Sequence, residues 1–238
     1  MGHQVQCEAT ARAPRDMGII HYFYLHGFAS SPDSGKAEYV RRRLAPLGVH
    51  LHAPDFNAPD FSSLTVTRML AQVRSAIVAL PPGPVGLIGS SLGGFVAIHA
   101  AASGTADPER PIARLVLLAP AVDFASGRDG WLSEAELERW RTTGWRDVFH
   151  HALGRSVPLH YGLYEDGSRY DAFEAEFDTP TLVFQGEQDT VVDPARVVGW
   201  AAPRRNVRVR MLADDHRLQV HLDAIWAESA AFFGIPAE

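Results

Sequence analysis

Residues 85–98 read Val85-Gly86-Leu87-Ile88-Gly89-Ser90-Ser91-Leu92-Gly93-Gly94-Phe95-Val96-Ala97-Ile98. The first four form a short apolar run that is typical of a buried strand, and the last four begin a run of helical character. Between them the pattern G-x-S-x-G allows a sharp turn, because small neighbours let the chain lift a serine hydroxyl above the edge of a sheet. The stretch therefore predicts a strand, a tight turn and a helix, with Ser91 as the candidate nucleophile.

The rest of the chain alternates short apolar runs with longer amphipathic segments. This order is typical of a mostly parallel sheet that is covered by helices on both faces. We expect strands at 19–25, 49–54, 85–89, 113–118, 181–185 and 207–212. We expect helices at 34–47, 64–80, 92–103, 194–202 and 218–233. The sequence thus predicts an α/β fold, arranged as a single domain over residues 19–238 after a flexible tail at 1–18.

One segment, from about 123 to 177, departs from this alternation and indicates a helical, cap-like insertion. It is rich in aromatic residues and contains no clear core strand. Ser133 and Glu136 form a capping box that predicts a helix through about Arg141, and Gly144 is a suitable stop. Insertions after a central strand often lie over the strand ends, where α/β proteins bind ligands.

The composition excludes several classes of function. With 238 residues, of which 46% are hydrophobic, the chain can bury a substantial core. A net charge of −6 without a dense basic block argues against nucleic acid as a partner. A single cysteine, Cys7, forms no internal disulfide or cysteine-rich metal site. We find no secretory signal and no membrane span in the sequence, and expect a cytoplasmic protein.

A serine nucleophile needs a general base, and the base needs an orienting acid. His216 follows a predicted strand in a short polar loop, whereas His221 falls within the next predicted helix. Asp189 lies in the loop after the apolar run at 181–184, while Asp193 precedes Pro194 as an expected helix N-cap. We therefore expect Ser91, Asp189 and His216 to form a catalytic triad. Two other carboxylates remain as alternatives to Asp189, namely Asp214 and Asp215.

A fourth element follows the first predicted strand, where the chain reads His26-Gly27-Phe28. Such a turn can bring the backbone N–H of Phe28 beside that of Leu92, so that the two donors form an oxyanion hole. The aromatic residues of the insertion have two interpretations. They either pack onto the helices that cover the sheet or cap Ser91. In the second case we expect the substrate pocket to include His26, Trp131, Trp140 and Trp145.

These residues resemble the α/β-hydrolase superfamily from about residue 19 to 234, and within it the small bacterial serine esterases of the YqiA-like type. The resemblance is carried by Tyr24-Leu25-His26-Gly27-Phe28-Ala29-Ser30-Ser31, Ile88-Gly89-Ser90-Ser91-Leu92-Gly93-Gly94, Gly186-Glu187-Gln188-Asp189 and Asp214-Asp215-His216-Arg217-Leu218. It implies the same triad and the same oxyanion-hole positions. The longer N-terminal tail and the tryptophan-rich insertion depart from that pattern.

The expected function is hydrolysis of a small-molecule carboxylic ester through an acyl-enzyme, with no cofactor and no metal. A thioesterase that acts on acyl-CoA would use the same triad and stays open as an alternative. A hydrolase-like binding protein without catalysis is a second alternative, against which the retention of all three triad residue types argues. The sequence leaves the ester, the acyl-chain preference and the oligomeric state undetermined.

Overall fold

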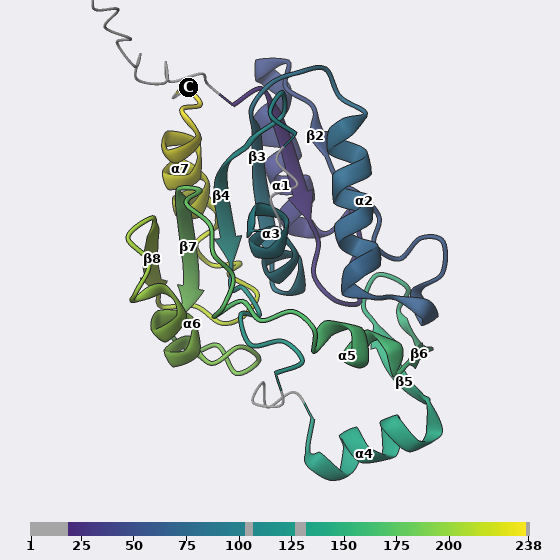
Figure 1. The fold of residues 1–238 in the computed structure, drawn as a ribbon. Helices are drawn as coiled ribbons and strands as arrows, with labels where there is room; N and C mark the ends of the chain where they lie inside the picture. The colour runs from purple at the N-terminus through teal and green to yellow at the C-terminus, as the bar shows by residue number, and fades with distance from the viewer. Residues whose placement is uncertain (1–18, 103–106, 127–131, 237–238) are drawn as a thin grey trace, which may run out of the picture.

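Six strands form a parallel sheet through the centre of the computed structural model, which describes residues 19–102, 107–126 and 132–236 (Figure 1). The order is β2-β1-β3-β4-β7-β8, and every neighbouring pair runs in parallel. The strands are β1 (His21–Leu25), β2 (Leu51–His52), β3 (Val85–Ser90), β4 (Ile112–Leu118), β7 (Thr181–Gly186) and β8 (Val207–Leu212). The predicted parallel sheet is confirmed. The expected tail at 1–18 lies outside the described residues.

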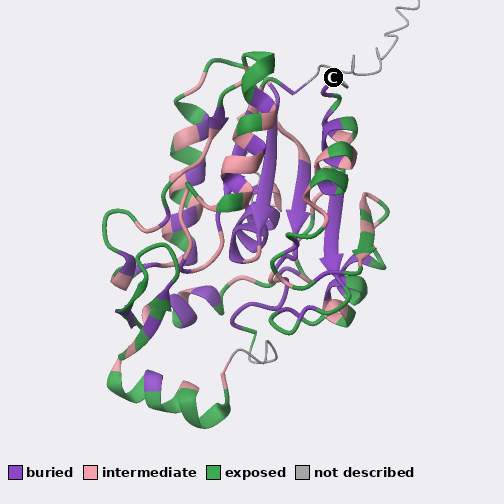
Figure 2. Cartoon of the chain, turned by 180° about the vertical axis from the view of Figure 1, so that it is seen from behind, coloured by how far each residue is buried: buried purple, intermediate pink, exposed green. Residues whose placement is uncertain are grey.

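Helices cover both faces of this sheet, because alternate strand residues point to opposite sides. On one face, side chains such as Leu25, Leu87 and Leu117 pack against α2 (Val66–Val78), α3 (Leu92–Ala102) and α6 (Pro194–Ala201). On the other face, Tyr24 and Ile88 pack against α1 (Gly35–Leu44) and α7 (Leu222–Phe233). Figure 2 shows the strands buried between these two layers. None of the helices in the described residues combines the length and the apolar character needed to cross a membrane.

Three predicted boundaries shift for local reasons. The first helix ends at Leu44 and continues as a 3-10 turn, η1 (Ala45–Leu47), because Pro46 cannot donate the next helical hydrogen bond. The second strand shortens to the two residues of β2. The last helix begins at Leu222 instead of 218, because Leu218 has a positive φ of 52° and belongs to the preceding turn. The remaining expected elements agree with the structure to within a few residues.

The insertion between β4 and β7 lies at the end of the molecule where the parallel strands finish (Figure 1). Its helix α4 (Glu134–Thr143) begins with the expected capping box of Ser133 and Glu136 and ends at Gly144, which has a φ of 74°. An antiparallel hairpin follows, made of β5 (Trp145–His150) and β6 (Arg155–His160), and then α5 (Gly162–Gly167). The hairpin was not predicted. It forms a sheet separate from the central one, and its strand β6 packs against η2 (Phe61–Ser63).

We predict that Gly93→Ala destabilises the protein severely, because a Cβ at this position would lie 2.0 Å from the backbone oxygen of Leu25. Neither α3 nor β1 can move alone, since both pack in the core. We expect the free energy of unfolding to fall by about 3 kcal/mol or more, as for strongly overpacked core sites. Urea denaturation followed by circular dichroism measures this loss.

Gly199→Ala is the matched control, because a Cβ on Gly199 in α6 would meet no atom within 4 Å. Alanine is a better helix former than glycine, so this variant should gain roughly 0.5–1 kcal/mol. Equal stability of the two variants would contradict the close approach of β1 and α3.

Candidate active site

Ser91 occupies the turn between β3 and α3 in a left-handed conformation, with a φ of 52°. Its amide donates a hydrogen bond to the carbonyl of Leu118, at 2.9 Å, and its own carbonyl accepts one from Gly94, at 2.8 Å. A Cβ on Gly89 would lie 2.5 Å from the carbonyl oxygen of Gly93. The turn is therefore too tight for a side chain at position 89, which explains the first glycine of the motif.

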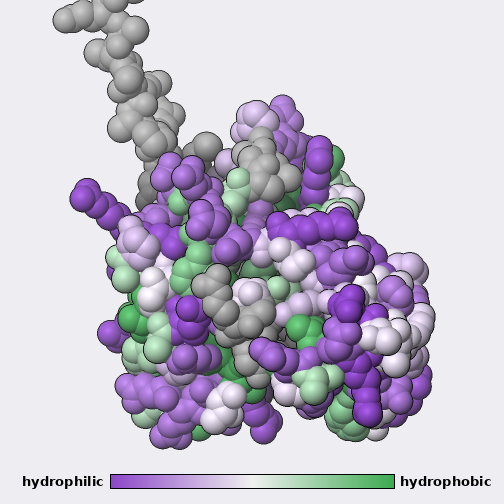
Figure 3. Space-filling view, turned by 60° about the horizontal axis from the view of Figure 1, so that its bottom comes forward, coloured by the Kyte–Doolittle hydropathy of each residue, from purple (hydrophilic) through white to green (hydrophobic). Residues whose placement is uncertain are grey.

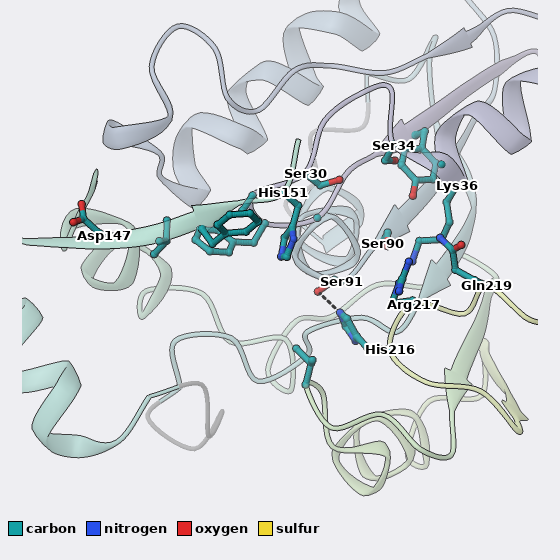
Figure 4. Close-up of a pocket in the computed structure, with 18 of the residues that line it drawn as sticks. Ser30, Ser34, Lys36, Ser90, Ser91, Asp147, His151, His216, Arg217 and Gln219 are labelled. Carbon is teal, nitrogen blue, oxygen red and sulfur yellow. Dashed lines mark hydrogen bonds between the residues drawn. The ribbon is translucent and has the colours of Figure 1, made fainter. Parts of the chain in front are cut away.

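The structure brings Ser91, His216 and Asp189 into one hydrogen-bonded chain. Figure 4 shows the bond between Ser91 and His216. His216 lies in the loop between β8 and α7, and Asp189 in the loop after β7. The Nε2 atom of His216 is 3.1 Å from the Ser91 Oγ, and its Nδ1 atom is 2.8 Å from an Asp189 carboxylate oxygen. In the matching tautomer, Nδ1 donates to Asp189 and Nε2 accepts the serine proton. This geometry can generate a serine nucleophile.

Asp189 is a buried carboxylate whose oxygens are held by N–H donors. One oxygen accepts from the amides of Val191 and Val192, at 2.8 and 2.9 Å. The other accepts from His216 and from the side-chain amide of Gln185, at 2.9 Å. Burial raises the pKa of Asp189, but the hydrogen bonds from His216 and the two backbone amides outweigh it and lower the pKa below its ordinary value. Asp189 is thus held as the anion that an imidazolium needs.

The loop that carries His216 is held by a second buried carboxylate, Asp214. One oxygen of Asp214 accepts from the amides of Val220 and His221, at 3.0 and 3.3 Å, and lies 3.1 Å from the His221 ring nitrogen. A Cβ on Gly186 would lie 2.4 Å from the Asp214 carbonyl oxygen, so the loop passes directly over the end of β7. Asp214 and His221 therefore pair with each other and shape the loop.

The other two candidate acids have local partners as well. Asp193 accepts from the amide of Ala195, at 2.8 Å, and caps α6 as expected. Asp215 accepts from the amide of Arg217, also at 2.8 Å. Of the four aspartates considered, Asp189 is the one that the structure places on the His216 ring.

The two expected oxyanion donors belong to the start of α3 and to the turn after β1. Leu92 is the first residue of α3, where backbone N–H groups have no partner within the helix. A Cβ on Gly27 would lie 3.2 Å from the Ser90 carbonyl oxygen and 3.4 Å from the Ser91 Cβ. The chain at Gly27 thus runs against the turn, and the next residue, Phe28, lines the same pocket as Ser91.

His26 does not line the pocket, which corrects the expectation from the sequence. It is 2% exposed, and its two ring nitrogens bind backbone: Nε2 accepts from the Phe56 amide at 3.0 Å, and Nδ1 lies 2.9 Å from the Gly27 carbonyl oxygen. Burial lowers its pKa, so the ring is neutral and can accept from Phe56. His26 therefore holds the Gly27–Phe28 turn in place through hydrogen bonds to the backbone.

A cavity of about 870 Å³ opens above Ser91. One wall comes from the turn after β1 and the start of α1, and a second from the hairpin. The hairpin contributes Arg146, Asp147, Val148, Phe149 and, in the turn after β5, His151. A third part comes from the loops after β7 and β8, with Val191, Arg217 and Gln219. The described surface at this end of the molecule is mainly hydrophilic, with small separate apolar areas (Figure 3).

Trp140 and Trp145, the two tryptophans of the insertion that the structure describes, do not line this pocket. Trp140 is 1% exposed, and its indole N–H donates to the Leu159 carbonyl at 3.1 Å, so it anchors α4 to the hairpin. Trp145 is 50% exposed, with its ring centroid 4.8 Å from that of His160. Neither lines the cavity. Trp131 lies outside the described residues.

Sequence reasoning missed several residues that shape the site, above all Gln185, Lys36 and Arg217. Gln185 gave no signal, because a glutamine within a strand is unremarkable in sequence. Lys36 had one, since it is the single lysine of the chain. In the part of the chain that the structure describes, no group of three or more His, Cys, Asp or Glu side chains is arranged to hold a metal ion.

Comparison with solved structures finds the same fold in distant proteins. A protein of Agrobacterium vitis S4 that carries a hydrolase assignment is 23% identical, over 90% of this chain and 87% of that one, with a TM-score of 0.79. Est1E from Butyrivibrio proteoclasticus, solved with ferulic acid bound, is 18% identical over 89% and 86% of the two chains, with a TM-score of 0.73. Mouse alpha/beta hydrolase domain-containing protein 10 is 19% identical over 91% and 90%, also with a TM-score of 0.73. No curated protein matches the sequence.

These similarities confirm the α/β-hydrolase fold that the sequence motifs predict. At the level of sequence families, residues 21–229 match the family described as "Uncharacterised protein family (UPF0227)". The match spans most of the chain, including β1, the Ser91 turn, and the loops that carry Asp189 and His216. The chain therefore belongs to the family UPF0227 and has the α/β-hydrolase fold.

Proposed function

We propose that this protein is a serine hydrolase of carboxylic esters that works through an acyl-enzyme intermediate. The observation that carries the proposal is the hydrogen-bonded chain from Ser91 through His216 to Asp189 at the base of an open cavity. A serine hydroxyl is a weak nucleophile, and this arrangement supplies the base and the orienting acid that it lacks.

In the first half of the reaction, the Ser91 Oγ attacks the ester carbonyl carbon and its proton passes to His216 Nε2. The carbonyl oxygen becomes an oxyanion, which the backbone N–H groups of Phe28 and Leu92 stabilise. The tetrahedral intermediate then expels the alcohol, which takes the proton from His216, and Ser91 is left acylated. Asp189 stabilises the imidazolium that forms on the way.

In the second half, water replaces the alcohol. His216 takes a proton from the water as it attacks the acyl carbon, and the same two amides stabilise the second oxyanion. The intermediate collapses to release the carboxylic acid, and His216 returns the proton to the Ser91 oxygen. The net reaction consumes one water and yields one acid and one alcohol, so the protein's own residues suffice for the proton transfers.

The direct test is a panel of p-nitrophenyl esters from acetate to palmitate, run beside acyl-CoA thioesters. We predict hydrolysis of the oxygen esters and its loss in Ser91→Ala, because removing a triad nucleophile can cost on the order of a millionfold in rate. Mass spectrometry of the trapped acyl-enzyme should locate the acyl group on Ser91. Ser90→Ala is the control within the same turn and should retain most of the activity. Activity that survives Ser91→Ala would refute the proposed nucleophile.

A second prediction concerns Asp189→Asn. An asparagine offers one oxygen in place of two, and its NH2 group would face either His216 and Gln185 or the two valine amides. We expect kcat to fall by about a thousandfold or more, because the imidazole loses its orienting anion. The unpaired donors should also lower the free energy of unfolding by about 1–3 kcal/mol.

Asp193→Asn serves as the matched control, because asparagine caps a helix nearly as well as aspartate. Both kcat and the thermal midpoint of this variant should stay close to the wild-type values. The proposed acid would be wrong if Asp193→Asn lost the activity and Asp189→Asn kept it.

A further inference from the structure

The chain contains 22 basic residues, of which 21 are arginines and one, Lys36, is a lysine. This lysine lies in the first turn of α1 and lines the cavity above Ser91. Figure 4 shows Lys36 beside Arg217 and Gln219 at one end of the pocket, with the Ser91 hydroxyl between this group and the hairpin residue Asp147. The pocket therefore has a cationic end next to the proposed nucleophile.

Lys36 borders two environments of opposite character. It lines a small apolar cleft with Ile88, Leu118 and Leu222, and it also lines the polar end of the active-site cavity. A lysine in such a position buries its aliphatic stem and directs its ammonium group to the wetter side. Within residues 19–102, 107–126 and 132–236, no carboxylate lies within ion-pair distance of this ammonium group.

The pKa of Lys36 reflects both its burial and the charges around it. Burial lowers the pKa of Lys36 to about 8; the negative charges of Asp189, Asp214 and Asp215 act in the opposite direction, and the Arg217 guanidinium lowers it further. The nearby Tyr24 phenol stays neutral, because burial raises its pKa to about 12. Asp189 and Asp214 are already committed to other hydrogen bonds. Lys36 is thus a desolvated cation whose charge an anionic ligand would stabilise.

Three further groups face the same end of the cavity. Arg217 is exposed, and no described carboxylate pairs with its guanidinium. The Gln219 side-chain nitrogen lies 3.9 Å from the point that a Cβ on Gly35 would occupy, at the start of α1. The N-terminus of α1 adds the positive end of a helix dipole. Asp147 is the one aspartate among the described pocket-lining residues, and it lies at the opposite end.

We propose that Lys36 and Arg217, with Gln219 and the first turn of α1, form a carboxylate-binding subsite, and that the preferred esters carry a free carboxylate. The second part rests on the proposed esterase function. An ammonium and a guanidinium group can both donate to a carboxylate, and such charge-assisted bonds are strong where water is partly excluded. The carboxylate can belong to the acyl or to the alcohol part of the ester.

Matched substrates separate these two cases, because a carboxamide has the shape of a carboxylate without its charge. Monoethyl glutarate is compared with ethyl glutaramate for the acyl side, and 4-acetoxybenzoate with 4-acetoxybenzamide for the alcohol side. We expect the wild type to prefer the carboxylate of at least one pair by about tenfold or more in kcat/KM, as for a charge-assisted hydrogen bond. When the kcat/KM ratio of a pair is compared between variants, any effect of a substitution on the chemical step that both substrates share cancels.

We expect Lys36→Met to lower this preference by about tenfold, since it removes the charge and keeps the apolar stem. Lys36→Arg should retain most of the preference, and Arg217→Met should lose part of it. Arg205→Met is the control, because it changes the net charge by the same amount as Lys36→Met. Arg205 is exposed and lies outside the pocket, so the preference should not change. A preference that is unchanged in Lys36→Met and Arg217→Met, or absent from both substrate pairs, would overturn the proposal.

The single lysine also permits a test without catalysis. Reductive methylation with ¹³C-formaldehyde labels Lys36 and the terminal amine and leaves arginines untouched, and it preserves the charge of the lysine. In Ser91→Ala labelled in this way, addition of glutarate should raise the pKa of the Lys36 signal in an NMR titration and leave the terminal amine unchanged. An unshifted Lys36 signal at saturating glutarate would contradict the subsite.

The two readouts keep the subsite and the esterase function apart. If glutarate shifts Lys36 but no ester is hydrolysed, the carboxylate subsite stands and the proposed function fails. If neutral esters are hydrolysed by way of Ser91 while glutarate leaves Lys36 unaffected, the function stands and the subsite fails.

Discussion

The close approach of β1 to the start of α3 is the constraint on which the rest of the site depends. A Cβ at position 93 would lie 2.0 Å from the Leu25 carbonyl, so the strand and the helix can meet only at a glycine. This contact sets the turn after β1 against the turn that carries Ser91, as the position of Gly27 shows. A single packing constraint therefore positions both the proposed nucleophile and the two proposed oxyanion donors.

One end of the cavity is cationic although buried carboxylates lie nearby, because those carboxylates are engaged in hydrogen bonds of their own. The buried carboxylates of Asp189 and Asp214 are each surrounded by N–H donors of their own loops and by a histidine. They stay ionised and orient neighbouring groups, but they do not neutralise the cations across the cavity. A protein with a net charge of −6 thus presents a cationic end of its pocket close to Ser91.

The insertion contributes to the pocket through residues of its hairpin, and neither Trp140 nor Trp145 lines the cavity. Trp140 fastens α4 to the hairpin, and the hairpin is tied to the main body, where the His151 amide donates to the Ala29 carbonyl at 2.9 Å. His150 lies 3.0 Å from the side-chain oxygen of Asn57, whose amide nitrogen donates to the Ser30 carbonyl at 2.9 Å. These bonds connect the wall of the cavity to the same β1 loop that carries Phe28. The shape of the pocket and the position of one proposed oxyanion donor are therefore mechanically linked.

The sequence by itself determined the features that depend on neighbouring residues. These include the strand-turn-helix around Ser91, the capping box of Ser133 and Glu136, the N-cap at Asp193, and the alternation that predicts a covered parallel sheet. Tertiary structure alone decided which of four aspartates reaches His216, that Gln185 supports it, that the hairpin and not Trp140 lines the cavity, and that Lys36 lines the same cavity as Ser91. The reason is physical: turns and caps are set by hydrogen bonds within a few residues, whereas the lining of a cavity depends on how segments far apart in the chain pack together.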